Sequence, residues 1–185
     1  MIELTIAAIE AHNPKYLGHP SRVAELSCAI GQRLNVNGQD YKDLYYAALL
    51  HDVGLLVLGH RVLGQKMTLL SRDRGRESAH PHLGADLLKE IRLFQGLVPL
   101  IRNHHEHWDG SGTPEGFSGD QIPMGARILC LLEYLEDVRF TLGEAPDLMD
   151  KQIETAKAGS GTKFDPQVVD AYLTLMNAAK RAESH

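Results

Sequence analysis

The hydrophobic and polar positions along the chain follow the spacing of amphipathic helices. In residues 20–34, Val23, Leu26 and Ile30 recur every three or four positions and would share one face of a helix. Further segments with helical spacing lie at residues 4–10, 40–52, 78–91, 97–107, 123–138, 147–158 and 166–179. No segment shows the convincing two-residue alternation of a strand. The pattern therefore predicts an all-α bundle.

Helix-capping and helix-breaking residues indicate where these segments begin and end. Asp40 is suited to cap the helix that follows it, and Gly54 is expected to break that helix. Asp165, which precedes a proline, is suited to cap the last helix. Residues 57–65 predict a short helix or a loop, and the glycine-rich residues 108–122 predict a loop.

Length, composition and charge narrow the class of protein. The chain has 185 residues, and we expect one domain over residues 1–185 with its own core. A net charge of -5 argues against a protein that coats duplex nucleic acid, because such proteins carry a basic face. No stretch is apolar for long enough to cross a membrane, and residues 1–11 lack the pattern of a secretion signal. We therefore expect no membrane partner and a cytoplasmic location.

Clustered histidines are the strongest chemical signal in the chain. Seven of the ten histidines fall in three short clusters, and imidazole is a common ligand of transition metals. Glu133 follows an apolar helical run, where a carboxylate is costly unless it is paired or bound to a metal. Taken singly, each of these residues also fits a solvated helix end or a salt bridge. Together they come from four predicted helices, and the candidate ligands are His51, Asp52, His80, His104, His105 and Glu133.

The order of these residues and the text around them resemble the HD superfamily, specifically the HD-GYP family of cyclic di-GMP phosphodiesterases. The most specific match is HHEHWDGSGTP at residues 104–114, which is similar to the family's HHExWDGxGYP stretch. Further matches lie at residues 18–23, 48–54, 80–84, 122–129 and 159–166. The resemblance covers residues 12–175, the expected core of an HD-domain helical bundle.

The resemblance implies a metal-dependent phosphodiesterase that acts on a cyclic dinucleotide such as cyclic di-GMP. It implies two divalent transition-metal ions, iron or manganese, bound by the six candidate ligands. The catalytic Asp52 would bridge the ions, which would activate a water for attack on phosphorus. His19 would be an optional or indirect ligand, and Asp109 would cap a loop or orient a ligand histidine. Three arginines would bind phosphate or pair with acidic side chains: Arg22, Arg127 and Arg139.

The chain departs from the family where the family contacts its substrate. Leu55 replaces the lysine of the HDxGK motif, and Thr113 replaces the tyrosine of GYP. Lys15 stands where three-metal members have a glutamate, and its charge would repel a third cation. We therefore expect two ions and a weak or altered activity.

Two alternatives to a phosphodiesterase stay open at this point. The chain could be a noncatalytic receptor for a cyclic dinucleotide, or an interaction module for a partner such as a diguanylate cyclase domain. It could also perform another HD-superfamily reaction, such as nucleotide phosphohydrolysis or di-iron oxygenation. We expect no receiver or sensor domain in the chain, which would be either a stand-alone protein or an excised output domain.

Overall fold

The computed structural model describes residues 2–12, 17–57 and 79–183, and these residues form an all-α fold. The prediction of an all-α bundle is confirmed. Apart from one isolated bridge between Ser160 and Phe164, the described residues contain no β-structure. The α-helices are α1 (Ile2–His12), α2 (His19–Arg33), α3 (Gly38–Leu50), α6 (His80–Leu88), α7 (Val98–Arg102), α8 (Met124–Leu142), α9 (Leu148–Gly159) and α10 (Pro166–Glu183). Two 3-10 turns, η3 and η4, cover Arg92–Phe94 and Gly119–Gln121.

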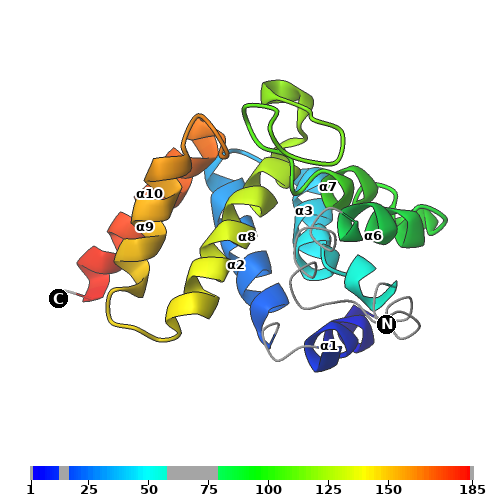
Figure 1. The fold of residues 1–185 in the computed structure, drawn as a ribbon, viewed down its shortest axis with the longest axis horizontal. Coiled ribbons are helices and arrows are strands. Elements are labelled where there is room, and N and C mark those ends of the chain that lie inside the picture. The colour runs from blue at the N-terminus through cyan, green and yellow to red at the C-terminus, as the bar shows by residue number, and fades with distance from the viewer. Residues whose placement is uncertain (1, 13–16, 58–78, 184–185) are drawn as a thin grey trace, which may run out of the picture.

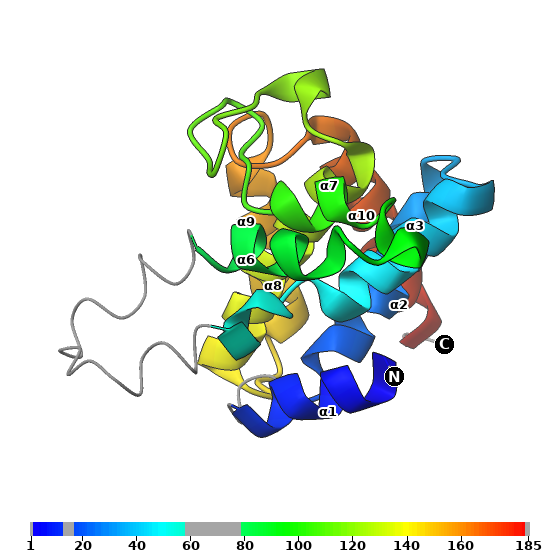
Figure 2. The same cartoon turned by 90° about the vertical axis from the view of Figure 1, so that its right-hand side faces the viewer.

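Three helices form the centre of the bundle, and the others pack around them. Figure 1 shows α9 and α10 at one side and α6 and α7 at the other, with α2, α3 and α8 between them. Helix α2 packs against both α3 and α8, while α8 also contacts α9 and α10. The view in Figure 2 brings α6 and α7 to the front of the bundle, where they lie side by side.

The core lies on the inner faces of these helices. Ile30 of α2, Leu44 of α3 and Ile101 of α7 are fully buried together with the apolar run of α8 at residues 128–132. Each large apolar side chain buried in this way contributes about 1.5–3 kcal/mol. Helix α8 thus runs through the centre of the core. Within the described residues, no helix has both the length and the apolar character that a membrane span requires.

Two helices end earlier than the hydrophobic pattern predicts. Helix α3 ends at Leu50 and helix α7 at Arg102, so the histidines that follow them lie in turns. In both cases the histidine Nδ1 donates a hydrogen bond to the carbonyl three residues earlier: His51 to Ala48 at 2.8 Å and His104 to Ile101 at 2.6 Å. These side-chain bonds use carbonyl groups that a continuing helix would need for its backbone ladder.

The predictions for the helix ends meet different outcomes. Asp40 does not cap α3, because it lies within the first turn and the N-cap is Asn37. Gly54 opens a further helical segment, residues 54–57, so the helix has already ended before it. The cap at Asp165 is confirmed, since its carboxylate accepts a hydrogen bond from the Gln167 amide at 2.8 Å. The predictions for Lys15 and for residues 58–65 lie outside the described residues.

Gly54 allows a close contact between the turn after α3 and the start of α6. A methyl group at Gly54 would overlap the carbonyl oxygen of His80 and lie 2.7 Å from the Gly84 amide nitrogen. We expect Gly54→Ala to lower the free energy of unfolding by about 1–3 kcal/mol, because the backbone must move apart. Urea denaturation followed by circular dichroism measures this change.

The neighbouring Gly84 provides a matched control for this measurement. A methyl group there meets side-chain atoms of Ile101 and Val53 at 3.2 Å and the Gly54 amide nitrogen at 3.3 Å. These contacts are looser than those at Gly54, and the two nearest are with side chains, which yield more easily than backbone. We expect Gly84→Ala to cost less than Gly54→Ala. An unchanged unfolding midpoint in Gly54→Ala would show that this contact does not constrain the fold.

Candidate metal centre

Five segments bring histidines and carboxylates to one point in the bundle. His19 is the first residue of α2, His80 is the first residue of α6, and Glu133 lies in the middle of α8. The turns after α3 and α7 supply the remaining four: His51, Asp52, His104 and His105. All six ligands predicted from the sequence therefore meet, and His19 joins them.

The first donor group consists of three imidazoles. His80, His104 and His105 each offer one nitrogen, and these nitrogens could hold a metal ion. The His80 Nε2 atom lies 3.1 Å from Nε2 of His104 and 3.3 Å from Nε2 of His105. His80 and His104 are buried.

The second donor group combines two imidazoles with two carboxylates. It consists of His19, His51, Asp52 and Glu133, and it too could hold a metal ion. The Nε2 atoms of His19 and His51 are 3.1 Å apart. The Glu133 Oε2 atom lies 3.2 Å from His51 Nε2 and 3.5 Å from His19 Nε2. From the sequence, His19 was expected to be an optional or indirect ligand. In the structure, the distance between the Nε2 atoms of His19 and His51 is as short as the distances between imidazole nitrogens in the first group.

Asp52 lies between the two donor groups. Its Oδ1 atom is 3.2 Å from His80 Nε2, on the side of the first group. Its Oδ2 atom is 3.5 Å from His51 Nε2 and 3.7 Å from His19 Nε2, on the side of the second group. This Oδ2 atom is buried and has no hydrogen-bond partner, although a buried carboxylate oxygen is normally paired. The two oxygens thus face two different donor groups, as those of a bridging carboxylate do.

The residues fit transition-metal ions in both donor chemistry and spacing. Metal–imidazole bonds of about 2.0–2.1 Å place two nitrogens on one ion about 2.8–3.4 Å apart. The nitrogen pairs described above are 3.1–3.3 Å apart. Because His104 Nδ1 donates to a carbonyl, the Nε2 atom of the neutral ring presents a lone pair to the neighbouring imidazoles. A cation between these lone pairs is the natural compensation.

The pKa values divide the histidines into two kinds. Burial lowers the pKa of His104 well below its usual value, and burial together with His80 lowers the pKa of His105 to about 4. Both rings are therefore neutral near pH 7, which is the form that binds metals. At His51, burial opposes the charged form, but Asp52 and Glu133 raise the pKa to about 9. The carboxylates thus favour positive charge at His51.

Glu136 is a site residue that the sequence did not single out. Its Oε2 atom lies 3.4 Å from His19 Nδ1 and accepts hydrogen bonds from Arg22 Nε at 2.9 Å and Nη2 at 2.6 Å. Carboxylates in this position orient the rings of metal-binding histidines. One signal was available: Glu136 follows Glu133 by three positions and therefore shares its face of α8.

A cavity of about 310 Å³ opens beside the second donor group. His19 and Glu133 belong to its lining, so the cavity and the donor group share two side chains. Two of the three arginines expected to bind substrate, Arg22 and Arg139, also line it. The cavity therefore joins the candidate metal ligands to two cationic side chains.

The third arginine, Arg127, is held elsewhere. Its guanidinium donates to the Ile122 carbonyl at 2.7 Å and to Asp165 at 3.0 Å, and it forms an ion pair with Asp120 at 3.0 Å. It also lies 5.2 Å from the centre of the Trp108 ring. These contacts connect α8 to the loop before it and to the start of α10. The described lining of the cavity does not include Arg127.

The loop after α7 is organised by two acidic side chains. Asp109 accepts a hydrogen bond from the Ser111 amide at 2.9 Å, so it caps the loop. Glu106 is buried and accepts hydrogen bonds from the amides of Glu115 and Gly116 at 2.6 and 3.2 Å. Of the two roles considered for Asp109, the structure thus shows the contact of a loop cap.

Comparison with known families decides the classification. The family model described as the HD domain matches residues 3–168, nearly the whole chain. The chain belongs to the HD domain family. The likeness read from the sequence to the HD superfamily and its cyclic di-GMP phosphodiesterases is therefore confirmed.

The curated relatives of this HD domain are longer proteins. The chain is 29% identical to the cyclic di-GMP phosphodiesterase response regulator RpfG of Xanthomonas campestris pv. campestris, over 82% of the chain and 41% of the relative. It is 30% identical to a probable cyclic di-GMP phosphodiesterase of Vibrio cholerae, over 89% of the chain and 41% of the relative. The chain thus spans less than half the length of these relatives.

Solved structures confirm the fold of this HD domain. A cyclic GMP-AMP-specific phosphodiesterase of V. cholerae matches with a TM-score of 0.72 and 23% identity, over 95% of this chain and 48% of that one. The HD domain of the L. monocytogenes phosphodiesterase PgpH, in complex with cyclic di-AMP, matches with a TM-score of 0.60 and 17% identity, over 95% of this chain and 96% of that one.

The bridging position of Asp52 predicts a large effect on metal content. We expect Asp52→Asn to reduce bound metal at both donor groups, because one substitution removes a charged donor from each. Elemental analysis of purified protein measures the metal content per chain. Asp109→Asn is the matched control, since it changes an acid of the loop and should leave the metal content unchanged. Full metal occupancy in Asp52→Asn would rule out the bridging role.

Arg127 is predicted to stabilise the fold. Its substitution by alanine leaves Asp165 buried without an ionic partner, and we expect the free energy of unfolding to fall by about 3–5 kcal/mol. Urea denaturation measures this loss, and Arg127→Met combined with Asp165→Asn should recover part of it because no buried charge is then unpaired. A stable Arg127→Ala protein with weakened substrate binding would instead support the role inferred from the sequence.

Proposed function

We propose that this HD domain is a metal-dependent phosphodiesterase that hydrolyses a cyclic dinucleotide such as cyclic di-GMP. The observation that carries the proposal is the carboxylate of Asp52, whose two oxygens face two separate groups of metal donors. Paired metal sites a few ångströms apart are a common arrangement for displacement at phosphorus. The names of the relatives, which include cyclic di-GMP and cyclic GMP-AMP phosphodiesterases, support the choice of substrate class.

The proposed cofactors are two divalent transition-metal ions, iron or manganese. One ion would be held by His80, His104 and His105 and the other by His19, His51 and Glu133, with Asp52 between them. This set contains the six ligands predicted from the sequence and adds His19. When bound, the ions would activate a water for attack on phosphorus and neutralise charge on the phosphate.

Neighbouring residues fix the orientation of the histidine rings in this centre. The carbonyls of Ala48 and Ile101 hold the rings of His51 and His104, so that their Nε2 atoms point to the donor groups. Glu136 holds His19 in the same manner. With these rings fixed, the donors need little rearrangement to bind an ion.

The two arginines of the cavity receive different roles in this proposal. Arg22 donates two hydrogen bonds to the buried Glu136, so it acts on His19 through that carboxylate. Arg139 donates to Glu144, a side chain with 89% exposure, and such an exposed pair is weak. Its Nε atom also lies 3.4 Å from Oε1 of the buried Glu136, while its Nη1 atom faces Glu144. A phosphate can therefore displace Glu144 from Arg139. Leu55, in the position of the family's lysine, provides no charge, which leaves Arg139 as the proposed phosphate contact.

The location and the partners have less support. A cytoplasmic location stays a prediction, and so does a diguanylate cyclase domain as partner. The solved complex of a similar HD domain with cyclic di-AMP supports a cyclic dinucleotide as the ligand class.

A hydrolysis assay tests the proposed function. We expect the protein to convert cyclic di-GMP to linear products when Mn²⁺ or Fe²⁺ is supplied, with activity lost on chelation. His104→Ala should abolish turnover, because it removes a donor of the first group. The matched control is His82→Ala, which removes a histidine of the same α6 helix outside the donor groups. Chromatography of the nucleotide products measures the rate.

The alternatives correspond to distinct outcomes of this assay. Tight binding of cyclic di-GMP by the metal-loaded protein without products would contradict hydrolysis and favour a receptor. Neither binding nor turnover with any phosphodiester would favour an interaction module or an oxygenase.

A further inference from the structure

The cavity beside the second donor group has an apolar rim. Phe140 and Leu17 both line it, although their exposures are 59% and 71%. The interior of the cavity is polar, with His19, Glu133 and Arg139 among its lining residues. The lining therefore combines charged groups near the metal donors with exposed apolar side chains at the edge. A nucleotide has the same division, because its phosphate is charged and its base has two apolar faces.

The position of Phe140 on α8 places it about one nucleotide length from Glu133 of the second donor group. It follows Glu133 by seven residues, which is two helical turns and about 10 Å along the same face of the helix. Arg139 is its neighbour in the chain. A phosphate that reaches the donor group and Arg139 would thus leave its own base in the direction of Phe140.

The size of the cavity indicates how much of a ligand it can hold. Its volume of about 310 Å³ lies at the lower end of ligand pockets, which range from about 300 to 1,000 Å³. It therefore suits one nucleotide unit of a cyclic dinucleotide. The second unit would lie outside this cavity.

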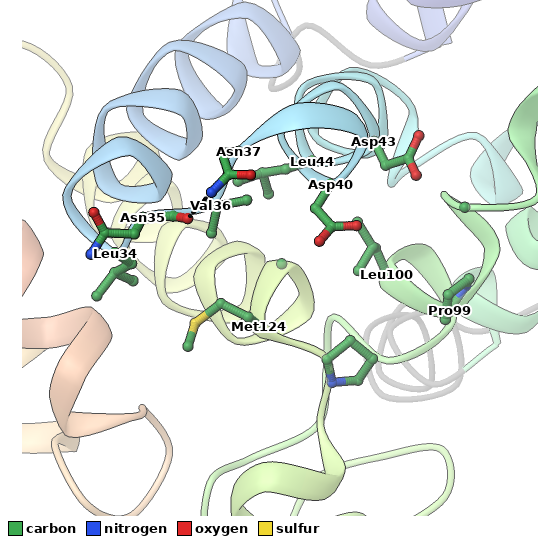
Figure 3. Close-up of a pocket in the computed structure, with 13 residues that line it drawn as sticks. Leu34, Asn35, Val36, Asn37, Asp40, Asp43, Leu44, Pro99, Leu100 and Met124 are labelled. Atoms are coloured by element: carbon green, nitrogen blue, oxygen red, sulfur yellow. Dashed lines mark hydrogen bonds between the residues drawn. The ribbon is translucent and has the colours of Figure 1, made fainter.

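Other features of the described structure fit a nucleotide less well. A larger cavity, of about 540 Å³, lies between the turn after α2 and the start of α8 (Figure 3), but its lining contains no lysine or arginine. Another cavity, of about 570 Å³, has Arg22 and Arg139 in its lining but none of the candidate metal donors. Trp108, the single tryptophan of the chain, lies against Arg127 and outside the lining of the cavity at the metal centre. Phe140 is the aromatic residue in that lining.

We propose, on the basis of the proposed function, that Phe140 is the stacking platform for one base of the cyclic dinucleotide substrate. Stacking on an aromatic ring tolerates every base, because each base has a π-face. Phe140 accordingly contributes to substrate affinity and leaves the reacting bond to the metal centre. Leu17, on the same rim, adds apolar contact to the bound base.

Two substitutions of Phe140 separate stacking from simple apolar contact. Phe140→Leu removes the ring and keeps an apolar side chain, whereas Phe140→Tyr keeps the ring. Loss of base stacking weakens binding by between about fivefold and about a hundredfold. We therefore expect Phe140→Leu to raise KM for cyclic di-GMP within this range with little change in kcat, and Phe140→Tyr to resemble the wild type.

Two controls make the effect specific to the base. Methyl 4-nitrophenyl phosphate has no nucleobase and carries its ring on the leaving group, so its kcat/KM should stay the same in Phe140→Leu. Tyr45→Leu removes another exposed aromatic ring, on α3 and outside the cavity lining, and should leave both substrates unaffected. Because Phe140 is exposed, Phe140→Leu should keep its unfolding midpoint, which circular dichroism checks.

The measurements distinguish failure of this inference from failure of the proposed function. Turnover of cyclic di-GMP that is equally efficient in Phe140→Leu and the wild type would overturn the stacking role and leave the phosphodiesterase intact. If the wild type turns over neither substrate, hydrolysis is refuted. In that case, equilibrium binding of cyclic di-GMP to the metal-loaded wild type and to metal-loaded Phe140→Leu tests the stacking role. Weaker binding by Phe140→Leu supports it. Equal affinity, or no binding by either protein, overturns it.

Discussion

The structure depends on a buried carboxylate placed between two groups of imidazoles. Asp52 is only 2% exposed, and one of its oxygens lacks a hydrogen-bond partner. Burial of an ionised carboxylate is costly unless a cation compensates its charge. His19 at the start of α2, His80 at the start of α6 and His51 in the turn after α3 surround it, with ring nitrogens 3.2–3.7 Å from its oxygens. A metal centre resolves this constraint more completely than the protein's own hydrogen bonds do.

The helices of the bundle are shaped around that centre. Helices α3 and α7 both end where a histidine donates a hydrogen bond to the carbonyl three residues before it. The residue after each of these histidines, Asp52 or His105, also belongs to the donor groups. Gly54 lets the start of α6 approach the turn after α3, so that His80 reaches Asp52. The donors therefore come from helix ends and turns, apart from Glu133, which lies within α8.

Two arginines of helix α8 have different roles because they differ in burial and in their partners. Arg127 is 9% exposed and its guanidinium is occupied by Ile122, Asp120 and Asp165. Arg139 lies three turns further along and lines the cavity, and it pairs with the exposed Glu144 as well as with the buried Glu136 at 3.4 Å. The first connects elements of the fold, whereas the second remains accessible to a ligand. Glu136, between them, supports His19 and is held in turn by Arg22.

The sequence by itself determined the fold class and the family, and it predicted as ligands six residues that the structure brings together. Helical periodicity and the spacing of His51, His80 and His104 are local properties of the chain, and they can be read without coordinates. The tertiary structure decided that His19 joins the donors, that Glu136 orients it and that Arg127 is a structural residue. These roles depend on which helix faces meet, and contacts between residues far apart in the chain, such as the 114 positions between Arg22 and Glu136, leave no periodic signal in the sequence.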